Sequence, residues 1–138
     1  MKPSHIEHIG LAVRNLEESI RYWEQVFGLK CYRIEEVADQ QVRTAFFKIG
    51  DTKIELLESM DADGPIARFI EKKGEGVHHI AFAVGNVEEA LQSVQDKNIV
   101  PIDTKPRPGA EGMQIAFLHP KSTHGVLTEL CSGSTNEK

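Results

Sequence analysis

Apolar and polar residues alternate along two stretches of the chain, residues 5–13 and 77–84. A period of two is typical of a strand that buries one face. One face carries bulky side chains, namely Ile9, Leu11, Val13, Ile80, Phe82 and Val84. The other carries a histidine followed by small residues, namely His8, Gly10 and Ala12, and His79, Ala81 and Ala83. We therefore predict two strands, each with its bulky face turned toward a covering helix.

A helical period follows each of these strands. Asn15 and Asn86 are good N-cap residues, and a glutamate stands three positions after each, as in a capping box. Apolar residues then recur every three or four positions, at Leu16, Ile20, Trp23 and Phe27, and at Val87, Leu91 and Val94. The first helix is predicted to stop at Gly28, since glycine favours the left-handed helix end.

The remaining pattern predicts three short strands after each helix. The expected strands cover roughly residues 30–38, 42–49 and 52–59, and then 100–105, 112–118 and 125–131. Residues 64–73 favour a linking helix with Pro65 in its first turn. The polar tail, residues 132–138, is predicted to be disordered.

The chain repeats itself. Residues 7–20 and 78–91 are identical at seven of fourteen positions, and KIELL at 53–57 matches LTELC at 127–131. We predict an α+β fold made of two tandem βαβββ modules, residues 5–60 and 76–131. One module is too small to bury its sheet alone. Residues 1–138 are thus expected to form one domain, whose two copies curve a mixed sheet around a shared cavity with pseudo-twofold symmetry.

Composition narrows the class of protein. The chain has 138 residues and a net charge of −5, which argues against a nucleic-acid partner or an anionic membrane surface. Its apolar runs fall short of the roughly 18 residues that a membrane span needs. The two cysteines, Cys31 and Cys131, give no disulfide framework. A reduced, cytoplasmic location is the expectation.

Two glutamates interrupt apolar strands at matching places in the repeat, Glu55 and Glu129. A carboxylate in an apolar strand is costly unless it is paired or bound to a cation. Pseudo-twofold symmetry would bring both together with His8 and His79. Two imidazoles and two carboxylates suit one divalent ion that keeps positions open for substrate. This donor set does not distinguish cobalt, zinc, nickel, manganese and magnesium.

The segments EHIGLAV, GVHHIAFAV and GVLTEL resemble the vicinal oxygen chelate superfamily, which includes glyoxalases and bleomycin resistance proteins, over about residues 5–131. Within it, GVHHIAF and IAFLHPKSTHGVLTEL look most like the methylmalonyl-CoA epimerase family. The resemblance implies a metal site at His8, Glu55, His79 and Glu129, the same four residues. One position departs from the pattern: Thr44 stands where some epimerases carry an extra glutamate.

The resemblance also implies an activity. The expected enzyme is an isomerase that interconverts the two isomers of methylmalonyl-CoA through a metal-stabilised enolate of the thioester. Glu129 is the expected base and Glu55 the second. Loop cations are expected to bind the CoA moiety, namely Lys105, Arg107 and Lys121, with Arg43 and Lys53 as further options. The resemblance further suggests a homodimer.

Three other functions share this type of fold. Glyoxalase I would use the same metal chemistry on a glutathione hemithioacetal. A drug-binding resistance protein would need no set of four metal ligands, so these four residues argue against that function. An extradiol dioxygenase needs two histidines and one carboxylate on iron, and the additional carboxylate of Glu55 argues against that reading.

Overall fold

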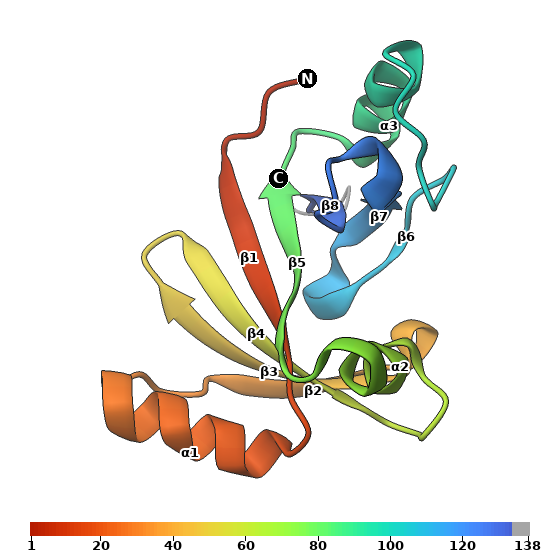
Figure 1. Cartoon of the computed structure of the whole chain (residues 1–138). Helices are drawn as coiled ribbons and strands as arrows, with labels where there is room; N and C mark the ends of the chain where they lie inside the picture. The colour runs from red at the N-terminus through yellow and green to blue at the C-terminus, as the bar shows by residue number, and fades with distance from the viewer. Residues whose placement is uncertain (134–138) are drawn as a thin grey trace. The chain divides into compact units, whose positions relative to one another are not determined.

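The computed structural model describes residues 1–133, with eight strands and three α-helices (Figure 1). The elements are β1 (His5–Ala12), α1 (Leu16–Phe27), β2 (Arg33–Val37), β3 (Val42–Ile49), β4 (Thr52–Ser59), α2 (Pro65–Lys73), β5 (Gly76–Ala83), α3 (Val87–Asp96), β6 (Arg107–Pro108), β7 (Gln114–Leu118) and β8 (Thr128–Ser132). The chain forms two compact units. The N-terminal unit is His8–His78, and the C-terminal unit joins Met1–Glu7 to the chain from His79 onward.

The N-terminal unit has its strands in the order β2-β3-β4-β1. β1 pairs with β4 in parallel, and the other neighbours are antiparallel. Helix α1 covers one face of this sheet, as Figure 1 shows. The core beneath the helix is built from Leu16, Ala45, Phe47, Ile54 and Leu56, with Ile9, Leu11 and Val13 packed against it. The bulky face of the first strand thus meets the helix, as its alternation predicts.

Helix α1 begins and ends where the sequence predicts. The Asn15 side chain accepts a hydrogen bond from the backbone N–H of Glu18, which satisfies one of the exposed donors of the first turn. At the other end Gly28 adopts a φ of 66°, a left-handed conformation that glycine tolerates without a Cβ clash. Asn86 caps α3 in the same way, through the backbone N–H of Glu89.

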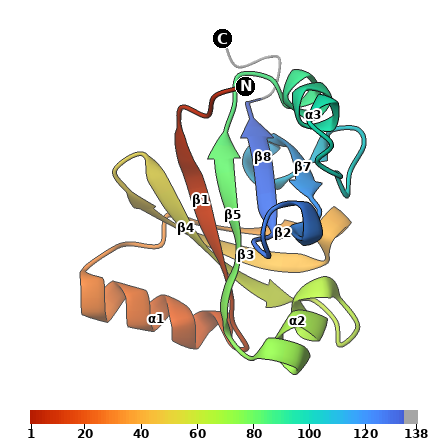
Figure 2. The same ribbon diagram turned by 45° about the horizontal axis from the view of Figure 1, so that its top comes forward.

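The C-terminal unit has its strands in the order β5-β8-β7-β6. β5 pairs with β8 in parallel, which repeats the pairing of β1 with β4. Helix α3 lies over one face of this sheet (Figure 2). Its buried residues pack with side chains of β7 and β8, namely Val87, Leu91, Val94, Ala116, Leu118 and Leu130. The α+β class and the βαβββ order of the modules are confirmed.

Two predicted boundaries differ most clearly from the structure. The strand expected at 100–105 is reduced to an isolated bridge at Pro101, and the edge strand is instead β6, two residues long. Three prolines between 101 and 108 explain this, since proline donates no ladder hydrogen bond. The predicted tail begins too early, because Ser132 is the buried last residue of β8. Residues 134–138 lie outside the described residues.

Among the described residues, none of the helices is both long enough and apolar enough to cross a membrane.

Leu16 provides a test of the N-terminal core. Its side chain is fully buried, so Leu16→Ala removes apolar contacts and leaves a cavity. We expect a loss of about 2–5 kcal/mol in the free energy of unfolding, measured by urea denaturation. Val26→Ala on the same helix is the matched control, because Val26 is 59% exposed. It should change stability by no more than about 0.5 kcal/mol. Equal losses in both variants would contradict this core.

Candidate functional site

The N-terminal unit buries one histidine against one glutamate. His8 comes from β1 and Glu55 from the adjacent β4, where Gly10 is the backbone partner of Glu55. The alternation of β1 puts His8 and Gly10 on the face opposite the α1 core. On that face His8 Nδ1 lies 3.0 Å from Glu55 Oε2. Gly10 has no side chain that could separate the imidazole from the carboxylate on this face.

The C-terminal unit repeats the arrangement. His79 comes from β5 and Glu129 from the adjacent β8, with Ala81 as the backbone partner of Glu129. His79 Nε2 lies 2.9 Å from Glu129 Oε1. The other carboxylate oxygen, Oε2, lies 2.8 Å from the thiol of Cys131. The two carboxylate oxygens of Glu129 therefore have different partners: Oε1 contacts the His79 imidazole and Oε2 contacts the Cys131 thiol.

Both pairs are shielded from water. The four side chains are 4–7% exposed. Buried carboxylates persist only when they are paired, hydrogen-bonded or bound to a metal. Two donors about 2.1 Å from a divalent ion, at right angles, would themselves lie about 3.0 Å apart. The imidazole–carboxylate separations of both pairs match that spacing, so each unit offers two ligands that fit a divalent ion.

Comparison with known proteins places the chain in a family. Residues 7–117 match the model of the glyoxalase/bleomycin resistance protein/dioxygenase superfamily. The chain belongs to this superfamily. The resemblance seen in the sequence is thereby confirmed.

Relatives within the superfamily point to one group. The uncharacterized protein YqjC of Bacillus subtilis is 44% identical over 93% of this chain and 91% of its own length. The mitochondrial methylmalonyl-CoA epimerase of Mus musculus is 33% identical over 94% of this chain and 73% of its own length. A variant methylmalonyl-CoA epimerase of Streptomyces coelicolor, solved in complex with 2-nitronate-propionyl-CoA, is 35% identical. It has a TM-score of 0.94, and the match covers 99% of both chains. These epimerases are isomerases, which is the enzyme class that the sequence predicts.

Thr44 lies on the same sheet face as Glu55. It is the backbone partner of Leu57, two residues beyond Glu55 on β4, and its side chain is 1% exposed. A threonine hydroxyl is too weak a base to remove a carbon-bound proton. Thr44 therefore cannot act as the base on this face of the N-terminal unit.

The cations predicted to bind CoA lie in three different settings. Lys105 and Lys121 are exposed. Arg107 is half-buried and pairs with Asp103. Arg43 hydrogen-bonds to Glu17 and Glu58, on the sheet face opposite Thr44 and Glu55.

The ion pair between Arg43 and Glu17 shifts the pKa of both groups. The Arg43 hydrogen bond lowers the pKa of the Glu17 carboxyl from its ordinary value, and the hydrogen bond to Glu17 in turn raises the pKa of Arg43. Both groups therefore stay charged at neutral pH. Arg43 links α1 to the sheet, which makes it a poor candidate for a CoA contact.

Sequence reasoning missed one buried carboxylate and one contact of a cysteine. Glu7 is only 6% exposed, and a carboxylate oxygen of Glu7 lies within 4.8 Å of Cys131 Sγ in the C-terminal unit. Cys131 is buried beside Ala81, Ile115 and Phe117. Its contact with Glu129 adds a role in orienting that carboxylate. The two-residue spacing of Glu129 and Cys131 on one strand was the available signal.

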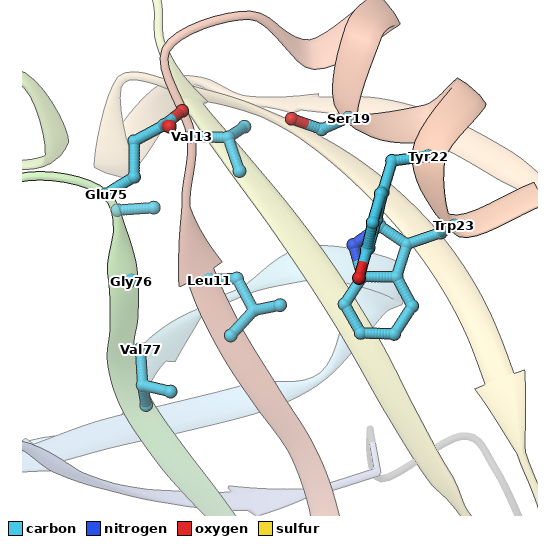
Figure 3. A pocket seen from close by; sticks show the side chains of 9 residues that line it. Leu11, Val13, Ser19, Tyr22, Trp23, Glu75, Gly76 and Val77 are labelled. Carbon is cyan, nitrogen blue, oxygen red and sulfur yellow. The ribbon is translucent and has the colours of Figure 1, made fainter. Parts of the chain in front are cut away.

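A separate pocket of about 340 Å³ lies in the N-terminal unit, between α1 and the start of β5 (Figure 3). Leu11, Val13, Tyr22, Trp23 and Val77 line it with apolar surface. Glu75 stands at its edge, where its carboxylate accepts a hydrogen bond of 2.7 Å from the backbone N–H of Arg14. Leu11 belongs to the helix-facing side of β1, and Val13 directly follows the strand. The pocket is thus on the opposite side of that strand from His8.

Proposed function

We propose that this protein is an epimerase of methylmalonyl-CoA. The observation that carries the proposal is the pair of buried imidazole–carboxylate contacts, His8 with Glu55 and His79 with Glu129, at matching places in the two modules. Kinship with methylmalonyl-CoA epimerases over more than nine-tenths of the chain supports the choice of substrate.

The four residues of the two pairs are proposed to hold one divalent ion. Nitrogen and oxygen donors of this kind suit cobalt, zinc, nickel, manganese or magnesium. Such an ion would supply Lewis acidity that polarises the thioester carbonyl and offsets the negative charge of an enolate.

The protein's own groups move the proton. Epimerisation breaks the C–H bond at the α-carbon, leaves an enolate, and forms a new C–H bond on the opposite face. Glu129 is proposed to take the α-proton on a carboxylate oxygen, and Glu55, starting as the carboxylic acid, to return a proton from the other side, so that the two groups exchange protonation states in one turnover. Electrons are neither gained nor lost by the substrate. The low exposure of both carboxylates favours the reaction, because water competes poorly for a buried base.

The CoA moiety needs cationic partners for its phosphates. Lys105 and Lys121 are proposed for this, since both are exposed on the C-terminal unit. A homodimer is proposed on the family resemblance alone, and a cytoplasmic location on the absence of a disulfide framework in the sequence. Light scattering after size-exclusion chromatography would test the dimer.

The isomer ratio of methylmalonyl-CoA over time tests the activity. Starting from one isomer, the protein should bring the mixture to equilibrium, and a chelator should abolish this because the enolate loses its counter-charge. The same preparation should not consume methylglyoxal and glutathione. Turnover of that hemithioacetal without epimerisation would favour glyoxalase I. Drug binding by a protein with no bound metal would favour a resistance protein.

A further inference from the structure

Arg107 lies on the same face of the C-terminal sheet as His79 and Glu129. The backbone partner of Arg107 is Ile115 on β7, and Ile115 in turn partners Cys131 on β8. Residues paired across strands point to one face, and Cys131 shares that face with Glu129. A cation from the short edge strand β6 is therefore directed toward the side of the sheet that carries the proposed chemistry.

Side-chain contacts connect the Arg107 guanidinium to His79. Its carbon Cζ lies 5.7 Å from the centre of the Phe117 ring. The Phe117 ring meets the His79 ring edge-on, with their centres 5.4 Å apart. The guanidinium is thus only two ring contacts away from the imidazole that pairs with Glu129.

Asp103 fixes the guanidinium in this position. Its Oδ1 lies 3.2 Å from Arg107 Nε, and its Oδ2 accepts a hydrogen bond of 2.9 Å from the backbone N–H of Phe117. The Arg107 and Asp103 side chains are 32% and 17% exposed, respectively. Nearby, a Cβ on Gly109 would come within 2.7 Å of Ile115, so the loop after β6 packs closely on β7. Arg107 is held in place by its surroundings, unlike the exposed Lys105 and Lys121.

We propose that Arg107 binds the free carboxylate of the acyl group and so selects acyl-CoA thioesters with a carboxylate on the α-carbon. The proposal rests on the proposed function, which places the α-carbon near Glu129. In such a substrate the carboxylate is attached to the reacting carbon, whereas the CoA phosphates lie beyond the whole pantetheine arm. A guanidinium presents five N–H donors in a planar fork, so one arginine can contact more than one carboxylate.

A comparison of two thioesters tests this role without relying on turnover. Methylmalonyl-CoA and propionyl-CoA differ only in the carboxylate, and their affinities for the metal-loaded protein can be measured by isothermal titration calorimetry. We expect Arg107→Gln to weaken methylmalonyl-CoA binding about 10- to 100-fold, the range of a lost charged hydrogen bond. Propionyl-CoA binding should change less than about twofold. Lys121→Gln, the matched control, should weaken both thioesters by the same factor.

Arg107→Lys guards against misfolding, because it keeps the charge beside Asp103. It should still lower the preference for methylmalonyl-CoA, since lysine lacks the planar fork. Equal weakening of both thioesters by Arg107→Gln would place Arg107 at the CoA phosphates and overturn the proposal. An unchanged preference in both Arg107 variants would also overturn it. Selective binding in the wild type without interconversion of isomers would instead refute the epimerase function and leave the role of Arg107 supported.

Discussion

Replacing Glu129 with glutamine should abolish epimerisation of methylmalonyl-CoA while the fold stays intact. Glutamine has the size and shape of glutamate, so it fits the 3% exposed position, where its one carbonyl oxygen can accept a hydrogen bond from either His79 or Cys131. It cannot take up a proton from carbon. Since positioned bases contribute about 10²- to 10⁴-fold to rate, we expect a loss of at least about 10²-fold. Incorporation of solvent deuterium at the α-carbon, followed by NMR, measures the step directly.

Starting each reaction from a single isomer sharpens the result. If Glu129 and Glu55 act on opposite faces, Glu129→Gln should stop exchange from one isomer more strongly than from the other, and Glu55→Gln should show the reverse preference. Glu88→Gln, an exposed change on α3, is the control and should exchange at the wild-type rate. Full exchange from both isomers in a folded Glu129→Gln protein that still binds metal would remove Glu129 from the mechanism.

The pairing of each histidine with its glutamate could be predicted from the sequence because both signals are local. Strand alternation places His8 opposite the bulky residues of β1, and the repeat then places His79 in the same way. Each glutamate could be identified as a site residue because it interrupts a strand of apolar residues. Because β1 pairs with β4 and β5 with β8, these local facts are enough to bring one imidazole and one carboxylate within 3.0 Å in each unit.

Other features of the site depend on contacts that local patterns do not contain. The place of Arg107 follows from the pairing of β6 with β7 and from the packing of Phe117 on His79. The strand predicted at 100–105 put β6 too early in the chain, so a loop cation became part of the sheet. The burial of Glu7 is similar, because only the assembled C-terminal unit brings it close to Cys131.

The repeat is also less symmetric than the sequence match indicates. Leu57 occupies the position in the first module that Cys131 occupies in the second. The thiol of Cys131 contacts Glu129, whereas a leucine offers Glu55 no hydrogen bond. The two carboxylates therefore differ in their surroundings, which is a physical reason to expect different roles for them during turnover.

Removing one imidazole should abolish the stabilisation that a divalent ion gives to the fold. An ion that binds only the native state stabilises it by about 2.7 kcal/mol when its free concentration is 100 times Kd. At roughly 3 °C per kcal/mol for a chain of this length, Tm should rise by about 8 °C when metal is added to chelator-treated protein. We expect His79→Ala to lose nearly all of this increment. Differential scanning calorimetry with and without metal measures it.

The test compares the rise in Tm on adding metal, rather than the absolute Tm of each variant. His79→Ala also leaves the buried Glu129 without its imidazole partner, and this destabilises the metal-free protein. His8→Ala, in the other unit, makes the test decisive. If one ion uses ligands from both modules, either variant should lose the increment, and the wild type should bind one ion per chain by mass spectrometry. An increment that survives in His8→Ala would mean that the C-terminal pair binds the ion by itself. His5→Gln, on the exposed start of β1, should behave as the wild type does.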